Sequence, residues 1–390
     1  MKFWVDFFAI VLVFSMLLAC VPFYVNAEDE KVKPISVPAP VVDCKSAILM
    51  EAKTGQVLYE QNADEALPPA SVTKIMTLLL VMEAIESGKL KYDDMVTASA
   101  HACSMGGSQI YLKEGEQMTV EDMIKSVVIS SANDAAVALA EHIAGSEDSF
   151  VSQMNDRAKA LGMKNTNFQN TNGLDDTVDD HVTSARDIAI MSRELIKHKK
   201  ITEYSSIWMD TIRDGQFGLT NTNRLVRFYK GATGLKTGST SKAGFCISAT
   251  AERDGITLIC VIMAAETRDI RNSAATALLD WGFANHAIYE APEIDLGRLR
   301  VIGGTLPYAT LVSDKYAAVI DRSSTTKVEY NIELPKTVSA PIKGGDRVGY
   351  ISFKIDGTEI GRVDISVKEE IDKIRYKDVL LRIFCAVSIN

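Results

Sequence analysis

Three short patterns in the chain contain residues that could together perform nucleophilic catalysis. S-x-x-K occurs at Ser71/Lys74, Ser239/Lys242 and Ser324/Lys327. S-x-N occurs at Ser131/Asn133 and Ser388/Asn390, and K-T-G occurs at Lys53-Thr54-Gly55 and Lys236-Thr237-Gly238. Each pattern alone is close to chance. The order S-x-x-K, S-x-N, K-T-G can be satisfied in only one way: Ser71/Lys74, Ser131/Asn133 and Lys236-Thr237-Gly238.

The first pair could be a nucleophile and its base. A serine at the start of a helix lies near free backbone N–H groups, which favour a developing negative charge. Lys74 follows three residues later, so its amine can reach the Ser71 hydroxyl. The amine must be neutral to accept a proton. Burial on an apolar helix and a second cation, Lys236, would both lower the pKa of Lys74.

The other two patterns could supply the rest of an acyl-transfer site. Ser131 could pass a proton toward a leaving nitrogen, and the Asn133 amide could orient the substrate. A strand edge at 236–239 could pair with an extended peptide. Gly238 would let that peptide approach closely, and an N–H near Ser239 could complete an oxyanion hole with that of Ser71.

Each of these residues also has an ordinary structural interpretation. Ser71 and Ser131 are typical helix N-caps, and a lysine is usually solvated. Lys53-Thr54-Gly55 shows that one pattern alone can occur without any catalytic role, because its sequence predicts a turn between two short strands. Lys74 is harder to dismiss, since the apolar run after it predicts a buried helix over 71–87. We therefore predict that the three patterns form one site.

Other catalytic classes lack their signatures. The sequence has no G-x-S-x-G elbow, no H-E-x-x-H and no Walker loop, and its five histidines carry no local triad signature. The cysteines show neither C-x-x-C nor Cys/His spacing, so we expect no metal site. Cys246 and Cys260 lie on neighbouring apolar runs, where a disulfide could form but buried free thiols are favoured.

The segment Pro69–Thr77 closely resembles the nucleophile segment of low-mass penicillin-binding proteins, the serine-type D-alanyl-D-alanine carboxypeptidase family. The three-motif set is shared by penicillin-binding proteins and class A β-lactamases. Asn172-Gly173-Leu174-Asp175 and Ser184-Ala185-Arg186-Asp187 add to the resemblance, which spans about residues 45–285. It implies a mixed α/β, penicillin-recognising serine fold: an antiparallel sheet flanked by helices, followed by a small all-β C-terminal domain.

The resemblance also implies a reaction. Ser71 would attack the carbonyl between the last two D-alanines of a peptidoglycan stem peptide, and water would then cleave the acyl-enzyme. Lys74 would be the base and Ser131 the proton relay, while Lys236 and Thr237 would hold the terminal carboxylate. Arg271 aligns with a family arginine proposed to assist there. β-Lactam antibiotics would acylate the same serine, and no cofactor would be needed.

Ser239 is the clearest departure from the family pattern. Some relatives carry histidine at this position, so their pH dependence and deacylation rates cannot be transferred to this chain. We therefore expect Ser239 to contact substrate without assigning it a proton-transfer role.

Three alternatives share parts of this pattern. A β-lactamase would use an acid in the loop between S-x-N and K-T-G, but residues 164–174 contain no Asp or Glu. A non-catalytic muropeptide-binding scaffold would not need a desolvated lysine pair. A transpeptidase differs only in the acceptor, an amine instead of water, and the sequence favours hydrolysis without deciding the ratio.

Composition limits the class of protein and its partners. The 390 residues are 47% hydrophobic and 24% charged, which is typical of a globular chain of two or three domains. The formal net charge of −9 disfavours nucleic acid as a partner. We divide the chain into a signal peptide (1–27), a leader (28–43), a catalytic domain (44–288), a β-rich domain (289–368) and an amphipathic helix (369–390).

The two ends predict export and contact with a membrane. An uncharged apolar run at 7–19 followed by Val25-Asn26-Ala27 is typical of a secretory signal. A retained N-terminal anchor and a lipoprotein box at Leu17–Cys20 are the alternatives. The stretch 369–390 alternates apolar and basic residues at helical spacing, and it is too short and too charged to span a bilayer. We expect it to lie on the membrane surface, and docking on its own domain is the alternative.

Overall fold

The computed structural model describes residues 38–176, 178–322 and 328–380. The predicted signal peptide and most of the leader lie outside these residues. The N-terminal part of the described chain contains a five-stranded antiparallel sheet in the order β2-β1-β9-β8-β7. Its strands are β1 (Ser46–Glu51), β2 (Val57–Gln61), β7 (Ala232–Thr240), β8 (Gly244–Arg253) and β9 (Ile256–Ala265).

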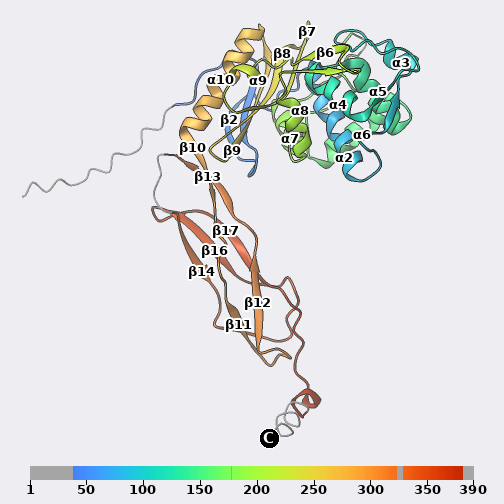
Figure 1. The fold of residues 1–390 in the computed structure, drawn as a ribbon. Helices are drawn as coiled ribbons and strands as arrows, with labels where there is room; N and C mark the ends of the chain where they lie inside the picture. The colour runs from blue at the N-terminus through green and yellow to red at the C-terminus, as the bar shows by residue number, and fades with distance from the viewer. Residues whose placement is uncertain (1–37, 177, 323–327, 381–390) are drawn as a thin grey trace, which may run out of the picture. The chain divides into compact units, whose positions relative to one another are not determined.

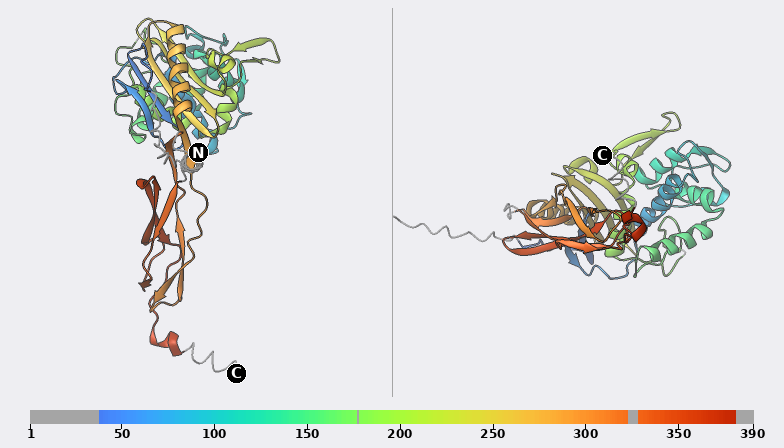
Figure 2. Two further views of the ribbon diagram at one scale, coloured as in Figure 1. Left: turned by 90° about the vertical axis from the view of Figure 1, so that its left-hand side faces the viewer. Right: turned by 90° about the horizontal axis from the view of Figure 1, so that it is seen from below.

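Helices cover both faces of this sheet (Figure 1). Helix α10 (Arg268–Asn285) packs along β8 and β9 on one face, as the turned view in Figure 2 shows. The other face packs against the 3-10 turn η1 (Ala70–Thr73), α7 (Ala185–Leu195) and α8 (Lys199–Ser205). The same helical layer contains α2 (Lys74–Glu86), α3 (Ala100–Cys103), α4 (Val120–Ile129), α5 (Asn133–Ala144) and α6 (Glu147–Ala160). The short helix α9 (Leu225–Phe228) instead contributes Leu225 to the core that α10 forms with the sheet. Two small two-stranded sheets complete this part: β3 (Met95–Thr97) with β4 (Gln117–Thr119), and the hairpin of β5 (Met209–Ile212) with β6 (Phe217–Thr220).

Several helices begin where the sequence places a short polar side chain. The side-chain oxygens of Thr119, Ser146, Ser184 and Thr267 accept backbone N–H groups in the first turns of α4, α6, α7 and α10. Ser71 and Ser131 do not act as such caps. The N-cap positions of η1 and α5 are Pro69 and Ala132, and neither has a side-chain cap hydrogen bond. The N-cap interpretation of both serines is therefore wrong.

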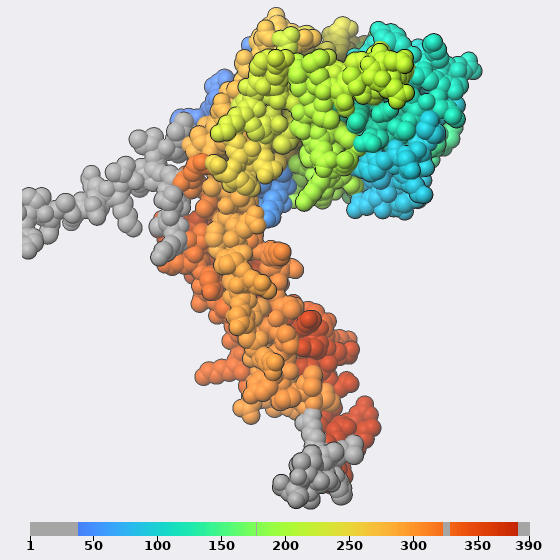
Figure 3. Space-filling view, viewed as in Figure 1, coloured from blue at the N-terminus to red at the C-terminus, as the bar shows by residue number. Residues whose placement is uncertain are grey.

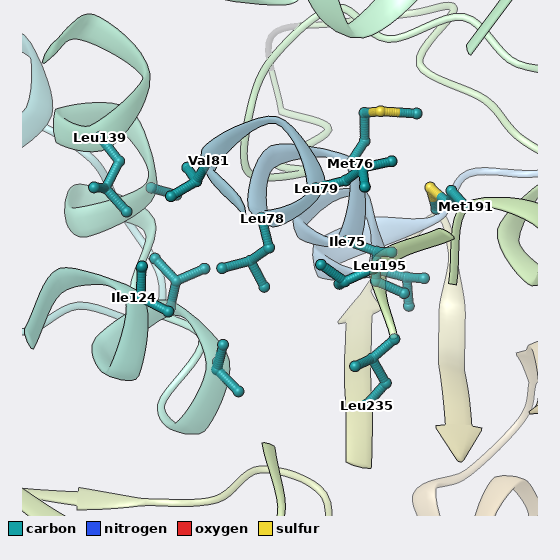
Figure 4. Close-up of a cluster of buried hydrophobic side chains, with 14 of the residues drawn as sticks. Ile75, Met76, Leu78, Leu79, Val81, Ile124, Leu139, Met191, Leu195 and Leu235 are labelled. Atoms are coloured by element: carbon teal, nitrogen blue, oxygen red, sulfur yellow. The ribbon is translucent and has the colours of Figure 1, made fainter. Parts of the chain in front are cut away.

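Helix α2 lies inside the main hydrophobic core. Its side chains point in opposite directions, with Leu78 and Val81 toward Ile124 and Leu139, and Ile75 toward Leu195 (Figure 4). A helix that is apolar all round can be stable only when neighbours cover every side. The buried run predicted after Lys74 is thus confirmed, although the α-helix begins at Lys74 and Ser71 lies in the preceding 3-10 turn.

A second all-β unit follows α10. Its six-stranded sheet has the order β14-β16-β17-β12-β11-β15, and a separate pair joins β10 (His286–Glu290) to β13 (Ala317–Asp321). The sheet strands are β11 (Arg298–Ile302), β12 (Tyr308–Ser313), β14 (Glu329–Glu333), β15 (Thr337–Ser339), β16 (Arg347–Ile355) and β17 (Thr358–Val367). Asp356 and Gly357 form the turn between β16 and β17 with φ of 48° and 79°, as the Asp-Gly pair predicts.

The predicted helix over 369–390 requires a correction. Ile371 is fully buried in the core of the β sheet and pairs with Ile342 in an isolated bridge. Within the described residues helical structure begins only at residue 376, and 381–390 lie outside them. The apolar spacing at 369–375 reflects packing on the sheet and not a helical face. No helix of the described chain is both long and apolar enough to cross a bilayer.

The cysteines in the described part of the chain are free. Cys246 and Cys260 are both buried, and β8 pairs with β9 so that Cys260 lies opposite Ala249. The expectation of buried free thiols is confirmed.

Candidate active site

The predicted residues meet in a cleft of about 740 Å³ beside the edge strand β7. The cleft is lined by Ser71, Ser131, Thr237, Gly238, Ser239 and Arg271, together with residues from the loops and hairpin on its other side. Segments separated by more than a hundred residues along the chain thus contribute to one surface. Lys74, Asn133 and Lys236 lie behind this lining and are almost completely buried.

The nucleophile candidate is held in a tight backbone arrangement. Ala70, directly before Ser71, has a φ of 49°, which is unfavourable for a residue with a side chain. Strand β7 presses against this turn, and a Cβ at Gly238 would lie 2.7 Å from the Ser71 nitrogen and 2.9 Å from the Val72 nitrogen. The absence of a side chain at Gly238 thus allows the η1 backbone to approach β7, while the expected approach of a substrate peptide stays a prediction.

We predict that Gly238→Ala lowers the rate constant for acylation by penicillin by about one order of magnitude. The added methyl must push β7 away from η1, forced overpacking costs about 1–3 kcal/mol, and 1.4 kcal/mol corresponds to a factor of ten. Stopped-flow acylation kinetics would measure the loss. Gly218→Ala in β6 is the matched control, because a Cβ there meets nothing within 4 Å. Equal rates in both variants would contradict the prediction.

Three acceptors surround the Lys74 amine. Its Nζ lies 2.9 Å from Ser71 Oγ, 2.5 Å from Asn133 Oδ1 and 2.8 Å from the carbonyl oxygen of Asn172. The orientation of the Asn133 amide is set from its other end, where Nδ2 donates to the Gly106 carbonyl over 2.7 Å. Two of the three partners can only accept, so a neutral amine gives them its two N–H groups and turns its lone pair toward the Ser71 hydroxyl.

Burial and charge both favour that neutral form. Removal from water lowers the pKa of Lys74 well below its ordinary value, and the positive charge of Lys236 lowers it further. The Asp134 carboxylate acts in the opposite direction. Asp134 is held by the backbone N–H groups of Ile110 and Leu112, at 3.1 to 3.2 Å. Ser71 therefore has a proton acceptor beside it that needs no histidine.

One part of the site is cationic. Lys236 is 1% exposed, and its burial, aided by the charge of Arg271, lowers its pKa to about 7. Arg271 is also buried, which lowers its pKa to about 10. Its guanidinium donates to Asn272 and to the Cys246 carbonyl. The Thr237 hydroxyl donates to the Thr222 hydroxyl over 2.8 Å. These groups form a region suited to a carboxylate.

Ser131 and Asn133 differ from each other in what they contact. Ser131 lies in the cleft wall with a φ of 62°, and within the described residues its hydroxyl has no hydrogen-bond partner. It is thus available to a bound substrate. The Asn133 amide is occupied at both ends, by Lys74 and by Gly106. Asn133 thus orients the Lys74 amine, and its expected contact with substrate through the second Nδ2 hydrogen stays a prediction.

Sequence reasoning missed several residues at this site. Arg224, Arg268, Trp208 and Phe228 also line the cleft, and Phe228 is 73% exposed. No local motif marks them. The β5–β6 hairpin that bears part of this wall contacts the segment around residue 110: Arg213 pairs with Glu116 and donates to the Ile110 carbonyl. The space-filling view shows the yellow-green hairpin against the teal segment (Figure 3).

The loop between residues 164 and 181 is ordered by hydrogen bonds wherever it is described. Asn167 pairs with Val182, Asn170 accepts from the Gly173 N–H, and Asp175 accepts from the Thr240 hydroxyl over 2.5 Å. The loop places the Asn172 carbonyl within hydrogen-bond distance of Lys74 Nζ. In the described residues no group of three or more His, Cys, Asp and Glu side chains is placed to hold a metal ion.

A serine hydrogen-bonded to a buried lysine, facing the edge strand of an antiparallel sheet, defines the class of penicillin-recognising serine acyl-transfer enzymes. The sequence comparisons agree. Residues 33–267 match the D-alanyl-D-alanine carboxypeptidase family, peptidase S11, and residues 295–373 match the C-terminal domain of penicillin-binding protein 5. The chain belongs to the D-alanyl-D-alanine carboxypeptidase family and is a serine-type hydrolase.

Relatives and solved structures extend over most of the chain. D-alanyl-D-alanine carboxypeptidase DacF of Bacillus subtilis is 41% identical over 348 residues, covering 87% of this chain and 89% of the relative. DacC of Escherichia coli is 36% identical over 350 residues, covering 87% and 86%. Penicillin-binding protein 5 of Haemophilus influenzae superposes with a TM-score of 0.78 at 31% identity, over 86% of this chain and 100% of that one. The predicted fold class and family are confirmed.

Proposed function

We propose that this carboxypeptidase removes the terminal D-alanine from peptidoglycan stem peptides through an ester on Ser71. The observation that carries the proposal is the environment of Lys74, whose two obligate acceptors leave its lone pair for the Ser71 proton. A buried lysine held in this way has little structural value, because burying a cationic group is costly. Its cost is explained by its use as a base.

Acylation follows from this arrangement. Ser71 Oγ attacks the carbonyl carbon of the penultimate D-alanine as its proton moves to Lys74 Nζ. The oxygen of that carbonyl gains negative charge and is stabilised by the backbone N–H groups of Ser71 and Ser239. The proton then passes from Lys74 through the Ser131 hydroxyl to the leaving nitrogen, and D-alanine departs. Water then attacks the ester carbonyl as its proton moves to Lys74 Nζ, and Lys74 returns that proton to Ser71 Oγ as the ester C–O bond breaks.

The terminal carboxylate of the substrate would bind at the cationic part of the site. Lys236 and the Thr237 hydroxyl would hold it, and the buried Arg271 guanidinium would add positive potential. Because the pKa of Lys236 is about 7, the free enzyme holds a mixture of charged and neutral Lys236 at neutral pH. An arriving carboxylate would raise that pKa and fix the charged form.

β-Lactams should acylate the same serine. Penicillin-binding protein D2 of Listeria monocytogenes, whose structure aligns with 63% of this chain at 33% identity and a TM-score of 0.58, has been solved with ampicillin bound. We extend this property to Ser71 because the lactam carbonyl and carboxylate reproduce the two groups of a D-Ala-D-Ala end that the cleft would hold.

Mass spectrometry of the mature protein from residue 28 tests the proposed function. It would be incubated with penicillin and, separately, with a pentapeptide ending in D-Ala-D-Ala. We expect a lasting adduct on the peptide that contains Ser71, together with release of D-alanine. Rapid penicillin turnover with an untouched peptide would instead indicate a β-lactamase. If neither an adduct nor free D-alanine appeared, only the non-catalytic scaffold alternative would remain.

We further propose that the enzyme is exported and acts at the outer face of the cytoplasmic membrane, held there by the C-terminal segment. Tyr376, Val379 and Leu380 are exposed in the helical turn that begins at residue 376, and the sequence of the C-terminal segment alternates apolar and basic residues. The proposal is also supported by the predicted signal peptide at 1–27, which would carry the chain across the membrane.

A chain ending at Arg375 should lose membrane binding while keeping full activity on a soluble peptide. This end point keeps Ile371 in the β-sheet core, whereas deletion from residue 369 would remove it. Sedimentation with phosphatidylglycerol vesicles would compare 28–375 with 28–390. Equal sedimentation of both forms would refute the anchor, and loss of activity in the shorter form would mean that the segment does more than bind lipid.

A further inference from the structure

We propose that His181 is a positioning residue for the reaction: its neutral imidazole ties the loop at 164–181 to Thr73 and thereby holds the Ala70–Ser71 backbone in its attacking arrangement. The proposal rests on the assignment of Ser71 as the nucleophile. None of the catalytic motifs contains His181, and the motif analysis above does not distinguish it from the other histidines.

The hydrogen bonds of His181 allow only one tautomer. Its Nδ1 accepts the backbone N–H of Gln169 over 3.0 Å, so Nδ1 carries no proton. Its Nε2 must then carry the proton and donate to Thr73 Oγ1, 2.8 Å away. The Thr73 hydroxyl in turn donates to the Ala70 carbonyl over 2.8 Å. All donors point the same way along this chain, from Gln169 through His181 and Thr73 to Ala70.

This chain ends at the strained point of the site. Ala70 has a φ of 49° and directly precedes Ser71. The loop also touches the same carbonyl, because a Cβ at Gly173 would lie 1.9 Å from the Ala70 oxygen and 2.8 Å from Thr73 Oγ1. A strained backbone persists only where its surroundings over-determine it. His181 and Gly173 provide that constraint from the loop side.

The same loop also orients the base. Asn172 directly precedes Gly173, and its carbonyl accepts from Lys74 Nζ over 2.8 Å. A shift of the loop relative to η1 would therefore disturb both the backbone before Ser71 and the hydrogen bond from Lys74 to the Asn172 carbonyl. Because His181 bonds to the loop at Gln169 and to η1 at Thr73, it sets the distance between these two segments.

Burial keeps His181 in the required form. His181 is only 4% exposed, and its ring packs against that of Phe168 with the ring centroids 5.8 Å apart. Burial lowers the pKa of His181 to about 4, although the Asp175 carboxylate acts in the opposite direction. Both ring nitrogens are engaged by Gln169 and Thr73, so the ring has no free nitrogen for the substrate. Its role is to position other groups and not to transfer a proton.

Three substitutions of His181 separate positioning from simple loss of packing. Glutamine can place an N–H near the position of Nε2 and keep the bond to Thr73, whereas asparagine reaches only the position of Nδ1. We expect His181→Ala and His181→Asn to lower the acylation rate constant by roughly 10- to 100-fold, since small misplacement of reacting groups has effects of this size. His181→Gln should recover to within about fivefold of wild type, an order-of-magnitude expectation from the same principle.

The measurement is stopped-flow acylation by penicillin over a range of concentrations, which separates initial binding from the acylation step. Binding should change less than about twofold, because the cleft that holds the carboxylate is untouched. His142→Ala is the control, since His142 is exposed on α5. Wild-type acylation rates in His181→Ala, or equal losses in the Gln and Asn variants, would overturn the proposal.

Thr73→Val supplies an independent test if the His181 variants fold poorly. Valine keeps the shape of threonine and removes the hydroxyl that links His181 to Ala70. We expect a similar loss in the acylation step, and the double variant Thr73→Val/His181→Ala should be no slower than the worse single one. Losses that multiply would show that the two residues act independently. A wild-type protein that is never acylated would refute the proposed function and not this inference alone.

Discussion

Ser71→Ala is expected to abolish covalent penicillin labelling and to lower kcat/KM for D-alanine release by about 10⁴-fold or more. Removing a nucleophile leaves only the binding and oxyanion contributions, which explains losses of that order. The hydroxyl contacts Lys74 but lies outside the hydrophobic core. The thermal midpoint of unfolding should therefore change little. Labelling followed by intact-protein mass spectrometry measures the first effect and calorimetry the second.

Two further variants make this result specific. Ser71→Cys should retain an acyl adduct with altered kinetics, because a thiolate is also a nucleophile. Ser324→Ala removes the serine of another S-x-x-K pattern and should leave labelling unchanged. Labelling that survives in Ser71→Ala would transfer the nucleophile to another residue and would remove the basis of the proposed mechanism.

Lys74→Arg should lower the acylation rate constant by roughly 10³-fold, within the range of 10²- to 10⁴-fold that general base catalysis supplies. Arginine keeps the positive charge but has no accessible lone pair, because its pKa lies far above the working range. Lys74→Met has no basic amine and should be as slow. It also leaves the oxygens of Asn133 and Asn172 without their donor, so the thermal midpoint should fall modestly. Lys159→Met is the control, since Lys159 is exposed on α6.

The pH dependence of the wild type follows from the two buried lysines. Lys74 must be neutral to act, and its lowered pKa moves the acid limb of kcat/KM well below the pH at which an exposed lysine titrates, with activity rising as pH rises through it. Lys236 must be charged to hold a carboxylate, so kcat/KM should fall as pH rises past about 7. The alkaline limb of kcat should lie at higher pH, because bound carboxylate raises the pKa of Lys236.

Comparison of the two profiles tests both roles. Lys236→Arg keeps the charge at all accessible pH values and should remove the alkaline limb while the acid limb remains. An alkaline limb that survives in this variant would assign it to another group. An acid limb that persists in Lys74→Arg would mean that Lys74 is not the titrating base.

The topology explains how these residues meet. Strand β7 enters the sheet at its edge, after the chain has passed through the helices on one face, and pairs with β8 on one side only. Its free edge therefore faces η1 and the joint before α5, where Ser71 and Ser131 lie. An edge strand normally risks unwanted pairing. Here the cleft and its proposed peptide substrate use the exposed edge.

Local residue types determined much of this protein from sequence alone. The order of the three patterns identified the site, and the apolar run after Lys74 identified a helix buried on all sides. The Asp356-Gly357 pair indicated the turn between β16 and β17 of the second unit. Each of these features depends on neighbours within a few residues, so the sequence shows it directly.

Only the tertiary structure decided how the site works. The Asn172 carbonyl that accepts from Lys74 is a backbone group, which no residue type marks, and Asn133 turns to the same amine because Gly106 holds its other end. The lowered pKa values of Lys74 and Lys236 arise from burial by segments remote in the chain. Likewise, the spacing of Ile371 suggested a helix, yet packing on a sheet buried it. Burial and partner geometry are sums over distant segments, and local patterns do not contain them.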